Sequence, residues 1–165
     1  MKSIKLLWLA FFALIMMVTM SVEWNTTQPK KAISLIKLEL AKEKTEAIAI
    51  VSSWNIEGAR LNTYIDFLFI IAYSSFLFAG VYRFSSMLKG WINPAGKLIA
   101  YMAPLAGVLD YIENFKMLKF LNNQDDFSSP FLVSAIKWGI AGFLFLLLIF
   151  LACANADQQK AGNKR

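Results

Sequence analysis

The sequence predicts an all-α integral membrane protein, a four-helix bundle with an extra amphipathic helix between its first and second spans. Two observations carry this prediction. Hydrophobic residues make up 58% of the 165 residues, whereas soluble domains usually contain about 45–50%. These residues are concentrated in long apolar blocks, each near the roughly 20 residues that cross a bilayer as a helix. We expect a single membrane domain over residues 1–165, with spans at about 4–22, 61–82, 97–120 and 130–152.

The first apolar block, residues 4–22, follows Lys2 and contains Lys5 near its start. A basic start and an apolar run are typical of a signal peptide. The block is followed by "EWNTTQPKK", which lacks the small residues of a cleavage site. We therefore expect an uncleaved signal anchor.

Residues 31–55 differ from the spans because charged and apolar residues alternate at helical spacing. The pattern predicts an amphipathic helix that lies along the membrane surface or covers one end of the bundle. Its predicted apolar stripe contains Ile33, Ile36, Leu40, Ala47, Val51 and Trp54. Glu39 falls among the charged residues of the opposite face.

Prolines mark the two later spans. Pro104 cannot donate a hydrogen bond to the carbonyl of Ala100, so we expect a kink in the span at 97–120. Pro130 stands at a favoured helix start. The polar tail at 155–165 is predicted to be disordered.

Short basic loops orient a multi-pass membrane protein, because Lys and Arg remain on the cytoplasmic side. With four spans, the basic residues outside the long 31–55 loop fall on one side. They are Lys2, Lys5, Arg83, Lys89, Lys97, Lys160, Lys164 and Arg165. We therefore predict a multi-pass protein with both termini in the cytoplasm.

Composition excludes several function classes. The chain has no histidine, which excludes His-ligated haem, His-based zinc sites and His general bases. Its one cysteine, Cys153, cannot form an internal disulfide or a CxxC pair. The net charge of +6 is explained by residues that flank the spans, so we expect the lipid bilayer and no nucleic acid as a partner. We predict no cofactor and no metal site.

Polar residues inside the predicted spans are the main functional signal, because such residues are costly in a bilayer and usually mark a site. On the third span, Asp110, Glu113 and Asn114 share one face at i, i+3 and i+4. Asp66 lies on the second span, on a face with Asn62 and Tyr73, and Lys137 lies on the fourth. The predicted site is Asp66, Tyr73, Asp110, Glu113, Asn114 and Lys137.

The depths of the four ionisable residues agree. At the helical rise, Asp110 lies about 20 Å from the cytoplasmic edge and Glu113 about 24 Å. Asp66 and Lys137 lie about 8 and 10 Å below the outer edge. All four therefore fall in the outer half of a core about 30 Å thick.

Four segments, in this order, resemble a family of small uncharacterised bacterial integral membrane proteins. They are "LELAKEKTEAIAIVSSW", "YIDFLFIIAYS", "GVLDYIENF" and "SAIKWG". The resemblance implies four helices and a bacterial membrane, and it implies no activity.

Three functions are compatible with such a polar site. The first, which we favour, is a binding or transport-related protein whose acidic site holds a small cationic or amphiphilic ligand. A single four-helix chain is small for a transporter, so transport favours a homodimer. The second is a membrane enzyme that acts on a lipid or isoprenoid with Asp110 or Glu113 as general acid or base. The third is an accessory subunit whose polar network only holds the helices together.

Overall fold

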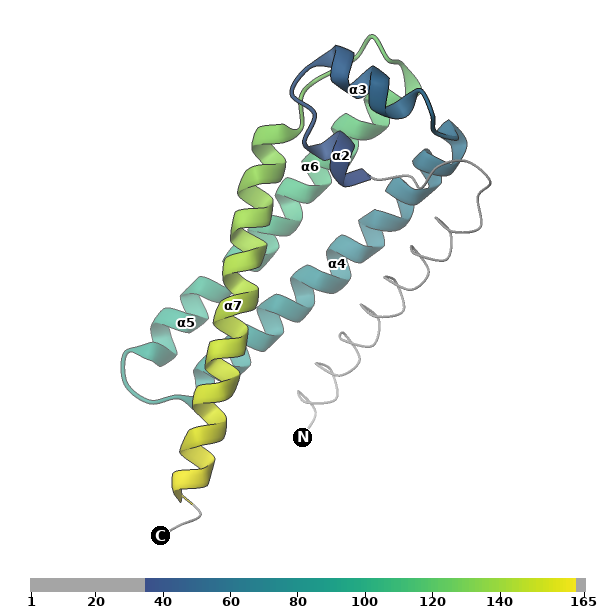
Figure 1. Cartoon of the computed structure of the whole chain (residues 1–165). Helices are drawn as coiled ribbons and strands as arrows, with labels where there is room; N and C mark the ends of the chain where they lie inside the picture. Colours follow the sequence, from purple (N-terminus) through teal and green to yellow (C-terminus); the bar gives the residue numbers. More distant parts are fainter. Residues whose placement is uncertain (1–34, 163–165) are drawn as a thin grey trace.

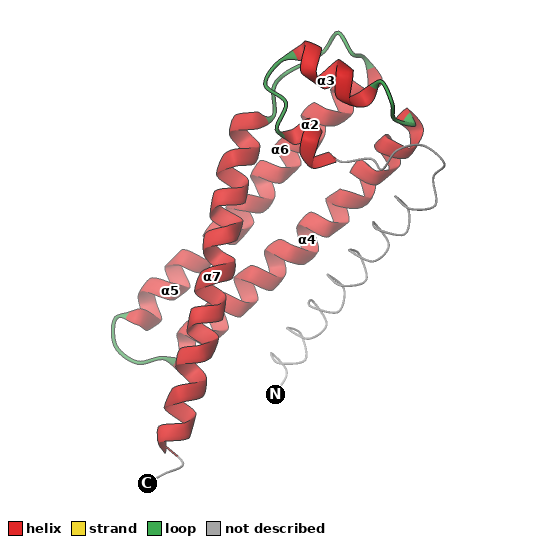
Figure 2. Cartoon of the chain, in the orientation of Figure 1, coloured by secondary structure: helices red, strands yellow, loops and turns green. Residues whose placement is uncertain are grey.

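The computed structural model describes residues 35–162, and of residues 157–162 only the backbone. The described residues form helices and no strand (Figure 2), which confirms the all-α class. The predicted first span at 4–22 lies outside the described residues. In chain order the helices are α2 (Leu35–Glu39), α3 (Lys44–Val51), α4 (Ile56–Met87), α5 (Ile92–Ala100), α6 (Met102–Asn122) and α7 (Phe131–Gly162).

Three long helices, α4, α6 and α7, pack against one another and form the body of the described chain (Figure 1). α6 runs antiparallel to both α4 and α7. α2 and α3 cover one end of these helices, and α5 packs on α4 at the other end. One end of the body is therefore covered by helices that precede α4 in the chain, and the other end by the short helix between α4 and α6.

Local signals explain where α4 begins and ends. The side chain of Asn55 caps its start by accepting a hydrogen bond from the Gly58 amide at 3.4 Å. After Met87 the chain turns at Gly90, which adopts a φ of 71° that residues with a side chain rarely take. The 32 residues of α4 span about 48 Å, more than the 30 Å core of a bilayer.

The predicted span at 97–120 is two helices rather than one kinked helix. α5 ends at Ala100, and Tyr101 separates it from α6. The Tyr101 amide bonds to the carbonyl of Leu98, three residues back, which tightens the end of α5. Pro104 then stands in the first turn of α6, where its missing N–H costs nothing. The proline thus marks a helix start instead of a kink.

The single amphipathic helix predicted over 31–55 is also wrong in the described part. The chain forms two short helices, α2 and α3, joined by residues 40–43. Its apolar stripe is shifted as well, because Ile36 and Leu40 are exposed whereas Leu38 is buried. The buried side of α2 also contains Glu39, which is only 6% exposed.

α7 is longer than the predicted span at 130–152. It continues to Gly162, so the part of the tail from 155 to 162 is helical and not disordered. Asn155 holds this extension on α4, since its amide donates to the Phe84 carbonyl at 3.0 Å. Disorder was predicted from the polar composition of the tail, but these polar residues continue α7 beyond its apolar block.

Two of the described helices are long and apolar enough to cross a membrane, Ile56–Met87 and Phe131–Ala156. Of the 18 most apolar consecutive residues in each of these helices, only 28% and 22%, respectively, are buried within the protein. The core helix of a soluble protein would be mostly buried, so this exposure favours contact with lipid.

Two apolar clusters fill the described core. One lies under α2 and α3 and includes Leu38, Ala59 and Phe120. The other lies where α4 and α7 approach α5 and includes Val81 and Leu144. The buried polar side chains of α6 lie between these clusters along the helix, at Asp110, Glu113 and Asn114.

Candidate functional site: a buried polar cluster

Lys137 of α7 is the centre of the site. Its side chain is almost fully buried, and its ammonium contacts carboxylates from two other helices. The Nζ atom lies 2.9 Å from Asp110 Oδ1, 2.9 Å from Glu113 Oε2 and 3.4 Å from Glu39 Oε2. An ammonium has three N–H donors, so three carboxylates can share it. Lys137 therefore ties α7 to both α6 and α2.

Aromatic side chains hold two of these acids in place. The Tyr73 hydroxyl of α4 donates to Asp110 Oδ2 at 2.8 Å. The Trp138 indole N–H donates to Glu39 Oε2 at 3.0 Å. The Tyr73 bond is made to the Asp110 oxygen that Lys137 does not contact, whereas Trp138 and Lys137 share the same Glu39 oxygen. A buried carboxylate requires such partners. We call Glu39, Tyr73, Asp110, Glu113, Lys137 and Trp138 the lysine group.

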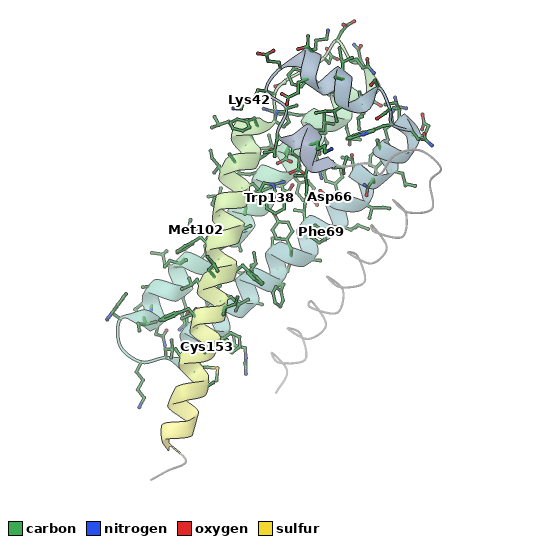
Figure 3. The ribbon with its side chains drawn as sticks, in the orientation of Figure 1. Lys42, Asp66, Phe69, Met102, Trp138 and Cys153 are labelled. Atoms are coloured by element: carbon green, nitrogen blue, oxygen red, sulfur yellow. The ribbon has the colours of Figure 1, made fainter. Side chains whose placement is uncertain are left out.

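Asp66 and Asn114 form a separate pair beside the lysine group. Asn114 is fully buried on α6, and its amide nitrogen donates to Asp66 Oδ2 at 2.8 Å. Asp66 is partly buried on α4 and forms no ion pair within the described part of the chain. Figure 3 shows Asp66 and Trp138 at a similar height along the long helices, on the side of α2.

The structure thus brings the six predicted site residues together as two neighbouring groups, each linked by its own hydrogen bonds. Tyr73, Asp110, Glu113 and Lys137 are linked directly. Asp66 and Asn114 are linked to each other, and Asn114 follows Glu113 in the chain. Helical spacing and depth were sufficient to predict this convergence.

Sequence reasoning missed Glu39 and Trp138. Glu39 was assigned to the charged face of a surface helix, and Trp138 was not among the predicted site residues. The available signal was a second apolar pattern, in which Leu35 and Leu38 are three residues apart beside Glu39. Choosing that stripe would have turned Glu39 toward the core.

Serine hydroxyls explain why α2 docks at this point. The last carbonyls of a helix have no partner inside it. Ser129 Oγ donates to the Ala41 carbonyl at 2.9 Å, and the Ser134 hydroxyl on α7 is shared between the Glu39 carbonyl at 3.1 Å and the Pro130 carbonyl at 3.0 Å. These bonds fix the end of α2 against the start of α7, so that the Glu39 side chain reaches Lys137.

The bundle's other basic residues on this side do not join the cluster. Arg60 pairs with Glu57 and donates to the Leu121 carbonyl. Lys116 donates to the Ser129 carbonyl at 3.2 Å. At the start of α3, Lys44 pairs with Asp125 at 2.7 Å, and this hydrogen bond lowers the pKa of the exposed Asp125 carboxyl.

Charge is unbalanced in the site. Glu39, Asp66, Asp110 and Glu113 bring four carboxylates against the one ammonium of Lys137, a formal charge of −3 if all are ionised. Isolated buried carboxylates are unstable unless they are paired, protonated or bound to a cation. The arrangement can therefore hold protons or a cationic group. The described residues contain no group of three His, Cys, Asp or Glu side chains placed to hold a metal ion.

Comparison of the chain with protein-family models, with curated proteins and with solved structures gives no match.

Proposed function

We propose that the chain is a multi-pass protein of the bacterial inner membrane whose buried acidic cluster binds a small cationic or amphiphilic ligand. In this proposal both termini are cytoplasmic, and residues 4–22, α4, α6 and α7 form a four-helix membrane bundle. The cluster lies in its outer half, and α2 and α3 cover it from the outside.

The distribution of polar and apolar residues on α6 supports the membrane assignment. Its buried face contains Asp110, Glu113 and Asn114, whereas its exposed face is apolar. The large exposed residues of this face are Leu105, Val108, Ile112 and Phe115. A helix on the surface of a soluble protein has the opposite arrangement. Polar groups inside and apolar groups outside are what a lipid solvent requires.

The orientation follows from charge. Arg83, Lys89 and Lys97 lie at the end of the body where α4 passes into α5. The opposite end contains acids as well as bases, among them Glu43 and Asp125. The first end is therefore assigned to the cytoplasm by the positive-inside rule.

The excess of carboxylates over ammonium groups is the observation that supports cation binding. Lys137 shares its charge among three acids, and Asp66 has no cationic partner among the described residues. A purely structural network can reach neutrality with one acid per base, as the Arg60–Glu57 pair does. Several further acids in a bilayer, where each is costly, are more readily explained by a ligand that completes the charge.

Native mass spectrometry of the protein purified in mild detergent tests this proposal. We expect a small molecule or lipid bound to the wild type and lost from the Asp110→Asn variant. Asn keeps the shape of the side chain, and its oxygen can accept from Lys137 while its NH2 group donates to the Tyr73 hydroxyl, so the fold should persist. The matched control is Asp125→Asn, which removes the same charge from an exposed loop.

The outcome against the proposal is equal spectra from equally stable wild type and Asp110→Asn protein. The structural alternative has its own supporting observation, because Lys137 connects α2, α6 and α7. Loss of folding in both Asp110→Asn and a conservative Glu113→Gln variant would favour it. The enzymatic alternative would gain if Glu113→Gln abolished a cellular phenotype while ligand binding persisted.

The size of the chain bears on transport. Four spans enclose little space for a pathway, so we expect a homodimer if the protein transports its ligand. The mass of the detergent-solubilised protein, measured by light scattering with the detergent contribution subtracted, distinguishes monomer from dimer.

A further inference from the structure

The second polar group of the cluster lies at the interface of α4 and α6. Asp66 and Asn114 meet there through the 2.8 Å bond between their side chains. Asn62 precedes Asp66 by one helical turn, so both project from the same face of α4. Along that face Asn62 lies between two contacts to α6, the Arg60 bond to the Leu121 carbonyl and the Asp66–Asn114 bond.

One amide oxygen in this group lacks a partner. The Oδ1 atom of Asn114 is fully buried and accepts no hydrogen bond. Asn62 is only 5% exposed, and it lies one turn before Asp66 on α4. Buried amides nearly always have partners, so the Asn114 oxygen requires an explanation. It belongs to the same amide whose nitrogen bonds to Asp66, a carboxylate without an ion pair among the described residues.

We propose that Asp66, Asn114 and Asn62 bind a hard monovalent cation of the sodium type. This inference rests on the proposed function, because it identifies the cation that one part of the acidic cluster takes.

The chemistry of the three side chains selects the ligand. They offer carboxylate and amide oxygens and no sulfur or imidazole, and hard cations prefer oxygen ligands. One carboxylate balances one positive charge, which favours a monovalent ion over a divalent one at a buried position. An anion is excluded by Asp66. The cation would accept a lone pair of the Asn62 oxygen and one of the Asn114 oxygen, which is buried without a hydrogen-bond donor.

The site is distinct from the lysine group. Lys137 contacts Glu39, Asp110 and Glu113, and neither Asp66 nor Asn114 is among its partners. Its ammonium therefore does not occupy the position that the cation would take. Both sites nevertheless share the field of the same acids, so that filling one lowers the negative charge felt at the other.

Thermal unfolding of the full-length protein in detergent tests the proposal. NaCl is varied against choline chloride at constant ionic strength and pH, and the melting temperature is followed by tryptophan fluorescence. A ligand that binds only the folded state raises the melting temperature with its concentration. We expect the melting temperature of the wild type to rise with Na⁺, and Asp66→Asn to abolish this rise. Asn62→Leu should raise the half-saturating Na⁺ concentration about tenfold, the effect of losing about 1.4 kcal/mol of binding.

One control variant and the expected folding of Asn62→Leu keep the test specific. Glu57→Gln removes a carboxylate from the same helix, but from a side chain that is 80% exposed, and should leave the Na⁺ response unchanged. Asn62→Leu removes an amide without hydrogen bonds, so it should fold. If Asn62 were bridged only by water, this variant would keep the wild-type response.

An Na⁺ response equal in wild type, Asp66→Asn and Asn62→Leu would overturn the proposal. So would a melting temperature that depends on pH but not on Na⁺, which would mean that Asp66 takes a proton. These outcomes can be distinguished from a failure of the proposed function. A ligand lost on Asp110→Asn without any Na⁺ response would retain the proposed function and remove the sodium site.

Discussion

Lys137 supplies the positive charge that partly compensates the carboxylates of the site. The residue is 4% exposed, and its ammonium lies within 3.4 Å of carboxyl oxygens from three acids. A buried ion pair gives little net stability, but removing one partner leaves the other charge without compensation. The lysine should therefore be the residue of the cluster that is least tolerant of substitution.

We predict that Lys137→Met destabilises the folded protein by about 3–5 kcal/mol, the usual effect of breaking a buried pair. Glu113→Gln in the same background should restore part of this loss, because it removes one of the uncompensated carboxylates. A double-mutant cycle on the free energy of unfolding in detergent measures this coupling. Lys116→Met is the control, since that ammonium bonds only a backbone carbonyl. Equal losses from Lys137→Met and Lys116→Met would contradict the prediction.

At this scale the sequence was informative where periodicity and depth agree. Asp110, Glu113 and Asn114 lie on one face of a long helix, so their convergence with Lys137 could be predicted. Glu39 could not, because α2 has only five residues and two apolar stripes were equally plausible. Contacts between segments, such as the Ser134 bond to the Glu39 carbonyl, decide between these stripes. The roles of these residues in binding stay predictions.

Among the elements, α2 and α3 depend most on contacts with the rest of the protein. α2 has five residues and α3 has eight, too few to be stable alone in water. α2 is held by two serine hydroxyls and by the Glu39 side chain. Its docking should therefore respond to small changes at Glu39.

We predict that Glu39→Gln loosens α2 and exposes residues 40–43 to protease. Glutamine has no charge to offer Lys137, although it can still accept from the Trp138 indole. Trypsin cleavage after Lys42, followed by mass spectrometry, should be several times faster than in the wild type. Glu57→Gln changes an exposed acid away from the cleaved bond and should leave the rate unchanged. Equal rates for both variants would mean that the serine bonds alone hold α2.

Close packing between helices gives a second element-scale prediction. A Cβ atom at Gly96 of α5 would lie 2.6 Å from Ser85 Cβ and would also overlap Ser85 Oγ on α4. Gly96→Ala should therefore lower the stability by about 1–3 kcal/mol through overpacking. Ser85→Gly in the same chain should restore it. The control is Gly142→Ala, because a Cβ atom there meets nothing within 4 Å. Melting temperatures measured in detergent test this loss of stability. A melting temperature unchanged in Gly96→Ala would show that α5 can shift on α4 to accommodate the added methyl group.

The element boundaries show where sequence patterns are insufficient. The apolar block at 97–120 was expected to be one helix, yet Tyr101 divides it. Pro104 was the correct signal, but whether a proline kinks a helix or begins one depends on packing between α4 and α5. Likewise the polar end of α7 is held by the Asn155 bond to α4, which no local pattern predicts.

For the whole molecule, the polar cluster lies inside the described chain, between two apolar clusters, and many large apolar side chains are exposed on the outside. The lysine group and the Asp66–Asn114 pair are enclosed by α2, α4, α6 and α7, and large apolar side chains cover the outside of the long helices. On the lipid-facing assignment, the outside needs no protein partner. The consequence that can be tested is the side of the membrane on which each end of the body lies.

Cysteine labelling in spheroplasts tests this topology. Cys153 is the one cysteine of the chain, so Cys153→Ser gives a background without thiols. Into it, Asp125→Cys marks the α6–α7 loop and Lys89→Cys marks the α4–α5 loop. Because short basic loops remain cytoplasmic, a membrane-impermeant maleimide should label Asp125→Cys in intact spheroplasts and Lys89→Cys only after lysis. Both must react in detergent, which controls for access. The reverse pattern would move the acidic cluster to the cytoplasmic half, and labelling of both before lysis would exclude a body that crosses the membrane.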